Sequence, residues 1–241
     1  MFEGVQLRDP VASLTHLFGF LAALYFTGLL WRLARGDRRR QLAVGIFGLS
    51  MCLLYFASST YHALLRPPSL INFFQRLDHS AIYVLIAGTY TPIYMVLLPR
   101  PLRTRLLLLM WVLAVVGIVC KWLLPMGAYE LSVGLYVSMG WTGLLSAVAL
   151  VRAIGWRATV FGVLGGVFYT IGGICDALKW PVIYPGVVRP HEVLHIFDLF
   201  GTFVHVIFVI RYVLPFGHPT SAGGSDRAAR LSPGGARSPS V

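Results

Sequence analysis

Charged side chains are scarce in this 241-residue chain, and their scarcity identifies its class. Only 12% of the residues are Asp, Glu, Lys or Arg, whereas 57% are hydrophobic. Soluble domains are about one-quarter charged, so the composition excludes an ordinary soluble enzyme and predicts a polytopic membrane protein. A bilayer crossing takes about 20 apolar residues, and the chain reads as consecutive crossings with short links. No stretch remains for a separate soluble domain.

Cysteines and acidic residues are also few. The three cysteines show no Cys-x-x-Cys spacing, which disfavours a disulfide framework or a cysteine metal site. Residues 1–10 lack the basic start and the small-residue cleavage site of a signal peptide.

The net charge of +11 would suggest nucleic-acid binding in a soluble protein. Here the arginines lie in links and in the tail, a distribution that orients helices in a membrane, so no nucleic-acid partner is expected.

The apolar runs predict an all-α fold, a bundle of seven transmembrane helices. The expected crossings are residues 11–33, 42–65, 80–98, 102–124, 131–151, 159–178 and 192–214. Residues 1–10 form a short N-terminal segment before the transmembrane domain, which covers residues 11–215. Residues 216–241, rich in Gly, Ser, Pro and Arg, are expected to form a disordered tail.

The basic residues predict the orientation of this bundle. Fourteen of the 20 lie in the tail and near the links that follow the first, third and fifth crossings. Cytoplasmic links carry the excess of Lys and Arg, so we expect the C-terminus in the cytoplasm and the N-terminus outside the cell membrane.

Histidines converge on one face of this predicted bundle. His191 and His195 are four residues apart at the start of the last crossing, a spacing that places two imidazoles on one helix face. Because successive crossings alternate in direction, His62 at the end of the second crossing and Asp78 before the third share that membrane face. Ser58 lies one turn deeper than His62 on the same stripe.

Three imidazoles beside a carboxylate suit zinc. Ligation by His62, His191 and His195 leaves a fourth position for water, the open arrangement of catalytic zinc. Asp78 could act as general base or bind the metal, and Ser58 could donate a hydrogen bond to a polarised carbonyl. In the alternative, Asp78 only caps the third helix and Ser58 bonds back to its own helix.

Other polar residues near this face have less definite roles. His16 enters from the same face at an unmatched depth, and His79 should point away from Asp78 toward the membrane interface. Asp198, three residues past His195, could support a ligand. Asp176 and Lys179, three residues apart, are most simply a local ion pair.

These motifs resemble those of the hemolysin III group of the progestin and adiponectin receptor family, in a superfamily with alkaline ceramidases. The matching pieces are Ser58-x-x-x-His62, Asp78-His79 and His191-x-x-x-His195, with His16 similar to the bacterial branch. The resemblance covers about residues 10–215. It implies an adiponectin-receptor-like fold, a zinc site from the three histidines with Asp78 and Ser58 alongside, and hydrolysis of lipid amides, chiefly ceramides.

Three functions follow as hypotheses. The leading one is a zinc-dependent membrane hydrolase that acts on a lipid amide or ester. The second is a membrane sensor or regulator in which the zinc is structural. The third is a lytic protein of the hemolysin type, which the apolar chain disfavours because it should stay in its own membrane.

Overall fold

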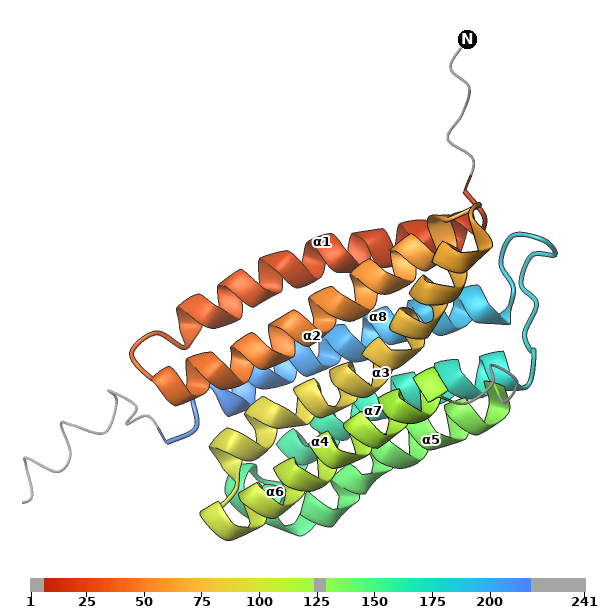
Figure 1. Ribbon diagram of the computed structural model, residues 1–241. Helices are drawn as coiled ribbons and strands as arrows, with labels where there is room; N and C mark the ends of the chain where they lie inside the picture. The colour runs from red at the N-terminus through yellow and green to blue at the C-terminus, as the bar shows by residue number, and fades with distance from the viewer. Residues whose placement is uncertain (1–6, 124–128, 218–241) are drawn as a thin grey trace, which may run out of the picture.

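The computed structural model describes residues 7–123 and 129–217, with side chains of residues 129–131 excepted (Figure 1). Residues 218–241 of the predicted tail lie outside this part. The described chain is helical apart from its links, with the elements α1 (Pro10–Leu33), α2 (Arg38–Ala63), α3 (Pro68–Leu97), α4 (Arg100–Leu123), α5 (Tyr129–Trp141), η1 (Thr142–Ser146), α6 (Ala147–Ile154), α7 (Trp156–Ala177), α8 (Pro190–Phe208) and η2 (Val209–Val213).

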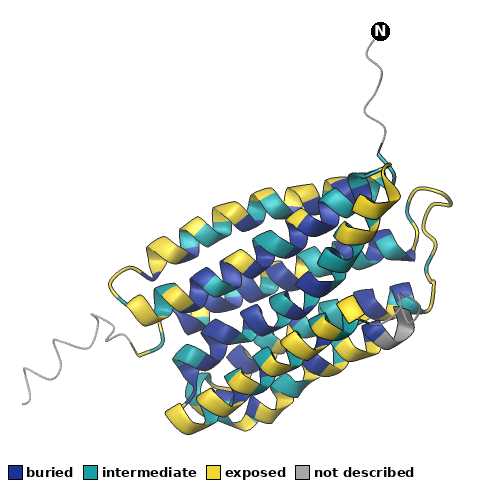
Figure 2. Cartoon of the chain, in the orientation of Figure 1, coloured by how far each residue is buried: buried dark blue, intermediate teal, exposed yellow. Residues whose placement is uncertain are grey.

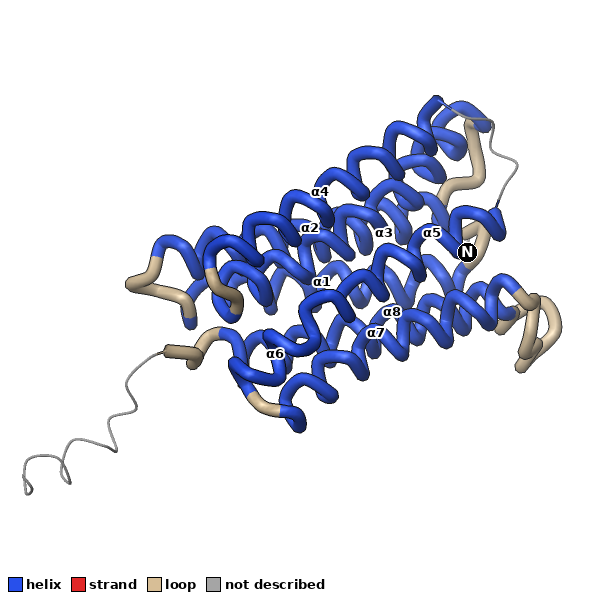
Figure 3. Tube along the Cα trace, turned by 90° about the horizontal axis from the view of Figure 1, so that it is seen from below, coloured by secondary structure: helices blue, strands red, loops and turns tan. Residues whose placement is uncertain are grey.

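Seven helical segments of the described chain are long and apolar enough to cross a membrane, which confirms the predicted number. The fifth crossing is not one regular helix, because the short 3-10 segment η1 separates α5 from α6. The last crossing ends similarly, with the π-helical turn η2 continuing α8. Figure 3, turned from the view of Figure 1, shows the crossings running alongside one another as a bundle.

The third crossing begins earlier than predicted. Its helix starts at Pro68, so Asp78 lies almost three turns inside α3 and cannot cap it. Proline is tolerated in the first turn of a helix, where its missing N–H has no helical partner to lose. The Pro67-Pro68 pair therefore starts the helix here. The correction removes the capping alternative for Asp78.

The core of the bundle is formed by α2, α3 and α8. In the apolar windows of these crossings, 61%, 67% and 50% of the residues are buried, against at most 28% in the other four. Figure 2 shows this contrast, with buried residues along the central helices and exposed ones on the outer faces of α1, α4 and α5. The three helices that carry the predicted metal ligands and Asp78 are thus the innermost ones.

At each end of the bundle, hydrogen bonds join segments that are far apart in the sequence. At one end, the Asp9 backbone N–H donates to the His62 carbonyl at 3.0 Å, joining the start of α1 to the end of α2. At the other end, the Arg40 guanidinium donates to the carbonyls of Leu214 and Phe216, beyond α8. The second contact satisfies carbonyls that a helix end leaves without partners.

Candidate metal centre

Three histidines from two helices meet at one end of the bundle. Nε2 of His191 lies 3.2 Å from Nε2 of His62 and 3.2 Å from Nε2 of His195. The ligand atoms of all three lie within 4.8 Å of one another. His62 and His195 are buried, and His191 is partly exposed. The structure therefore brings together the three residues that the sequence predicted as metal ligands.

Local sequence places these side chains. His62 lies in the last turn of α2, and α8 begins at Pro190, so His191 and His195 fall on successive turns of one face. Glu192 fixes the start of α8, because its Oε2 accepts a hydrogen bond from the Arg189 backbone N–H at 2.9 Å. This contact satisfies one of the donors near a helix start and holds the ligand-bearing turn in place.

Two carboxylates support the ligands from behind. Oδ2 of Asp9 lies 3.1 Å from Nδ1 of His62, and Oδ2 of Asp176 lies 3.3 Å from Nδ1 of His191. Sequence reasoning gave Asp9 no role. It described Asp176 only as the partner of Lys179, a pair that the structure contains at 3.3 Å. The carboxylate-to-imidazole contacts are of the kind that orients ligands in protein metal sites.

Asp9 lies in a strongly cationic setting outside the first crossing. Partial burial alone would raise the pKa of its carboxyl group. Hydrogen bonds from His62, Arg8 and Arg189 outweigh that effect and lower this pKa to about 2. The same network raises the pKa of Arg189, mainly through the hydrogen bond to Glu192 and to a smaller extent through the one to Asp9. Asp9 is therefore an ionised acceptor at neutral pH.

The donor set fits a metal ion. Since an ionised carboxylate can only accept, we infer that Nδ1 of His62 and of His191 carries the hydrogen, which leaves each Nε2 with its lone pair. These two lone pairs face each other across 3.2 Å, an arrangement that a cation between them would stabilise. Ligands about 2.0–2.1 Å from a tetrahedral zinc ion lie roughly 3.3 Å apart, close to the 3.2 Å that separates Nε2 of His191 from Nε2 of His62 and of His195. His62, His191 and His195 could thus hold a metal ion.

The remaining histidines near this end lie deeper. His16 of α1 is buried and stacks on His195, with ring centroids 3.7 Å apart, so it packs against a ligand from behind. His79 was expected to point to the membrane interface. Instead it lines an internal cavity together with Asp78 and Ser58. Asp78 is buried, and the Ser58 hydroxyl lies beside its carboxylate.

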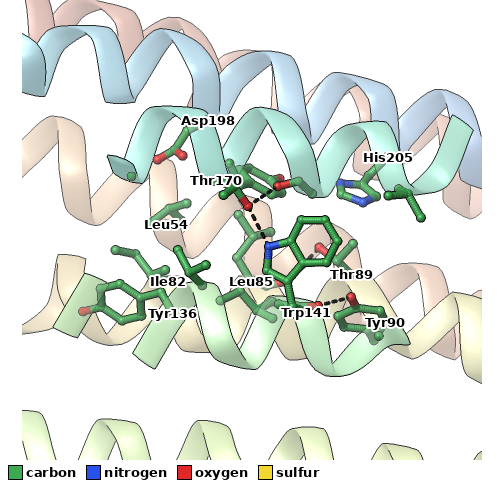
Figure 4. A pocket seen from close by; sticks show the side chains of 18 of the residues that line it. Leu54, Ile82, Leu85, Thr89, Tyr90, Tyr136, Trp141, Thr170, Asp198 and His205 are labelled. Carbon is green, nitrogen blue, oxygen red and sulfur yellow. Dashed lines mark hydrogen bonds between the residues drawn. The ribbon is translucent and has the colours of Figure 1, made fainter. Parts of the chain in front are cut away.

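Two cavities of different character meet at the histidines. An outer one of about 470 Å³ is bordered by polar side chains, among them Asp9, His62, Asp176, Arg189 and His191. An inner one of about 190 Å³ is reached by His191 and His195 and is otherwise mainly apolar. Figure 4 shows part of its wall, with aliphatic and aromatic residues such as Leu54, Ile82 and Tyr136 around the space.

The inner cavity is long. Its lining includes residues of α8 from His191 to Phe208, which at 1.5 Å per residue corresponds to roughly 25 Å along the helix. Asp198 lies in this wall, one turn below His195. Its carboxylate makes no hydrogen bond to an imidazole ligand within the described chain, so the suggested support of a ligand by Asp198 is not seen.

Comparison with known proteins places this architecture in a family. The profile of the family described as Haemolysin-III related matches residues 6–206. Hemolysin-3 of Bacillus cereus is 33% identical over 75% of this chain and 79% of its own length. The Hemolysin-3 homolog of Bacillus subtilis is 31% identical over 86% and 95%. The adiponectin receptor protein of Drosophila melanogaster is 24% identical over 79% of this chain and 47% of its own length. The chain belongs to the haemolysin-III-related family of seven-helix membrane proteins.

Proposed function

We propose that this protein is a zinc-dependent membrane hydrolase that acts on a lipid amide or ester. The observation that carries the proposal is the position of the three histidines, between a polar outer cavity and a long apolar inner one. Water can reach such a site from the outer side while a hydrocarbon chain occupies the inner side. The linkage between headgroup and chain would then lie at the histidines.

His62, His191 and His195 would hold the ion, and Asp9 and Asp176 would fix the orientation of two of these imidazoles. A bound zinc ion would supply Lewis acidity toward the carbonyl oxygen and toward water. Asp78 would accept the proton of the attacking water as the new C–O bond forms. It would then return that proton to the leaving amine or alcohol as the old bond breaks. Ser58, beside Asp78, would donate a hydrogen bond to the developing oxyanion or to the carboxylate.

The inner cavity also offers a route for a membrane lipid. Trp141, Leu144 and Val163 line it and are 37%, 55% and 36% exposed. These residues would border an opening of the cavity at the side of the bundle, between the fifth crossing and α7. Across this opening the Trp141 indole N–H donates to the Thr170 hydroxyl at 3.0 Å, as Figure 4 shows. A chain could enter here from the bilayer without passing through water.

The test is zinc analysis and turnover of the purified protein on a panel of lipid amides and esters. His191→Ala should lose both the metal and the activity. Asp78→Asn should keep the metal and lose a factor of about 10² to 10⁴ in rate, the usual contribution of a positioned general base. Undiminished turnover after complete removal of zinc would refute the proposal.

A second candidate, a sensor or regulator with a structural zinc, is favoured by the links between segments. The site joins α2 to α8 and, through Asp9 and Asp176, to the start of α1 and the end of α7. In that case His62→Ala should lower the melting temperature while the wild type turns over no lipid of the panel. The two candidates thus give different results in one set of measurements.

A further inference from the structure

The last helix carries a polar stripe into the apolar cavity. His191, Asp198 and His205 recur at seven-residue intervals on α8, two helical turns apart, and all three line the inner cavity. The first belongs to the metal centre, whereas the other two have no part in it. Figure 4 shows Asp198 and His205 at different depths of the same wall.

The side chain of Asp198 has hydrogen-bonding positions that no described residue fills. The Tyr55 hydroxyl donates to its backbone carbonyl at 3.2 Å, but its side chain forms no hydrogen bond or ion pair with any described residue. An acidic side chain within a transmembrane helix is costly and usually has a partner. Here the carboxylate borders the cavity, so its partner is expected to be a molecule that occupies the cavity.

Other polar groups on α8 differ from Asp198 in their hydrogen-bond partners or in their exposure. The Thr202 hydroxyl is satisfied, because it accepts from Tyr55 at 2.6 Å and lies 2.7 Å from the Tyr169 hydroxyl. His205 is only 8% exposed and stacks on Tyr169, and its Nδ1 has no partner within the described chain. Of these groups, Asp198 alone combines a position in the cavity wall with a partly exposed side chain that has no partner in the described chain.

The depth of Asp198 in the cavity determines which part of a bound hydrocarbon chain would lie beside it. It lies about 7 Å further along α8 than the level midway between His191 and His195, at 1.5 Å per residue. A hydrocarbon chain with its hydrolysable linkage at the histidines would pass Asp198 several carbons from that linkage, well before the cavity ends near Phe208.

We propose that the chain bound in the inner cavity carries a hydroxyl group, which donates a hydrogen bond to the carboxylate of Asp198. The substrate class is then a lipid with a hydroxylated chain. Asp198 is the residue that selects it over a plain hydrocarbon chain. The inference rests on the proposed function for the identity of the cavity as a lipid-chain site, but it requires binding only and no turnover.

The experiment measures binding of free fatty acids to the full-length protein in detergent, by displacement of a fluorescent fatty acid. The probes are chains of equal length with no hydroxyl, with a hydroxyl a few carbons from the carboxyl group, or with one near the far end. Wild type should bind the second probe several-fold more tightly than the plain chain, the usual net gain from one hydrogen bond. Asp198→Leu should reverse this preference, and Asp198→Asn should reduce it.

Two matched variants control for general damage to the cavity. Thr89→Val removes a lining hydroxyl that already donates to the Leu85 carbonyl at 2.8 Å, so the preference should not change. His205→Phe alters the same stripe two turns deeper and should not alter the preference for the second probe. Melting temperatures verify that each variant is folded.

The outcomes separate this inference from the proposed function. An equal preference in wild type, Asp198→Asn and Asp198→Leu would overturn the assignment of Asp198, as would tighter binding of the plain chain by wild type. A hydroxyl preference that depends on Asp198 would support the inference even if no lipid is hydrolysed. Failure of every chain to bind would overturn it.

Discussion

Replacement of Asp9 by Asn tests whether the carboxylates behind the imidazoles belong to a metal centre. The substitution removes the negative charge 3.1 Å from Nδ1 of His62 but leaves an oxygen that can still accept the hydrogen bond. Because the pKa of Asp9 is lowered to about 2, the native carboxylate is ionised throughout the pH range in which neutral imidazoles bind metals. The expected result is weaker zinc binding with an intact fold.

The expected loss of zinc affinity depends on how deeply each carboxylate is buried. Loss of a carboxylate that orients a histidine ligand typically costs 10- to 100-fold in metal affinity, or about 1.4 to 2.7 kcal/mol. The Asp9 side chain is 19% exposed, so water screens its charge and the effect should be near tenfold. The Asp176 side chain is 2% exposed, and Asp176→Asn should approach 100-fold through His191. The Asp9–Arg189 ion pair lost in the same variant adds little, since Arg189 is 49% exposed.

The assay is competition for zinc between the purified protein and a chelator of known affinity, at fixed pH. Asp37→Asn is the matched control. Asp37 caps α2 at the opposite end of the bundle by accepting from the Arg40 N–H at 3.0 Å, a role that Asn fills as well. Zinc affinities that agree within twofold for wild type, Asp9→Asn and Asp176→Asn would refute the assignment of these carboxylates to the centre.

Three further predictions concern packing, metal and orientation. A Cβ on Gly165 would lie 2.4 to 2.8 Å from ring atoms of His205, whereas one on Gly166 meets nothing within 4 Å. Gly165→Ala should therefore lower the unfolding free energy by about 1–3 kcal/mol, and Gly166→Ala should leave it nearly unchanged in the same denaturation assay. Chelation of zinc should lower the melting temperature of wild type but not of His195→Ala, and an equal shift in both would contradict a role of this ligand. A reporter fused after Val241 should give a cytoplasmic signal, and an external signal would reverse the proposed orientation.

The topology of the site could be predicted because it depends only on the number and direction of the crossings. His62 and His191 are 129 residues apart in the chain, yet the alternation of seven crossings places both at one membrane face. The i, i+4 spacing then adds His195 to the same cluster. These are consequences of helix geometry and bilayer thickness, which do not require side-chain detail.

The supporting carboxylates could not be predicted in this way. Asp9 precedes the first helix, and its contact with His62 depends on how the chain enters α1, which hydrophobic periodicity does not specify. The local pair of Asp176 and Lys179 was correct but incomplete, because one carboxylate oxygen faces the lysine and the other faces His191. The third crossing was predicted to start at residue 80, whereas α3 starts at Pro68, because proline favours the first turn of a helix and the helix extends beyond the apolar run.

The inward face of α8 carries an unusual number of polar groups. A bundle that needed α8 only for packing would be expected to bury an apolar face, yet this helix directs two imidazoles, a carboxylate, a hydroxyl and a further imidazole toward the interior. Thr202 has its partners in Tyr55 and Tyr169, and two of the imidazoles have theirs in carboxylates or in each other. Asp198 lines the cavity, and its side chain has no hydrogen-bond partner within the described chain. Since open polar groups are retained inside a membrane only at a cost in stability, the wall of this cavity is better suited to an oxygenated chain than to a plain one.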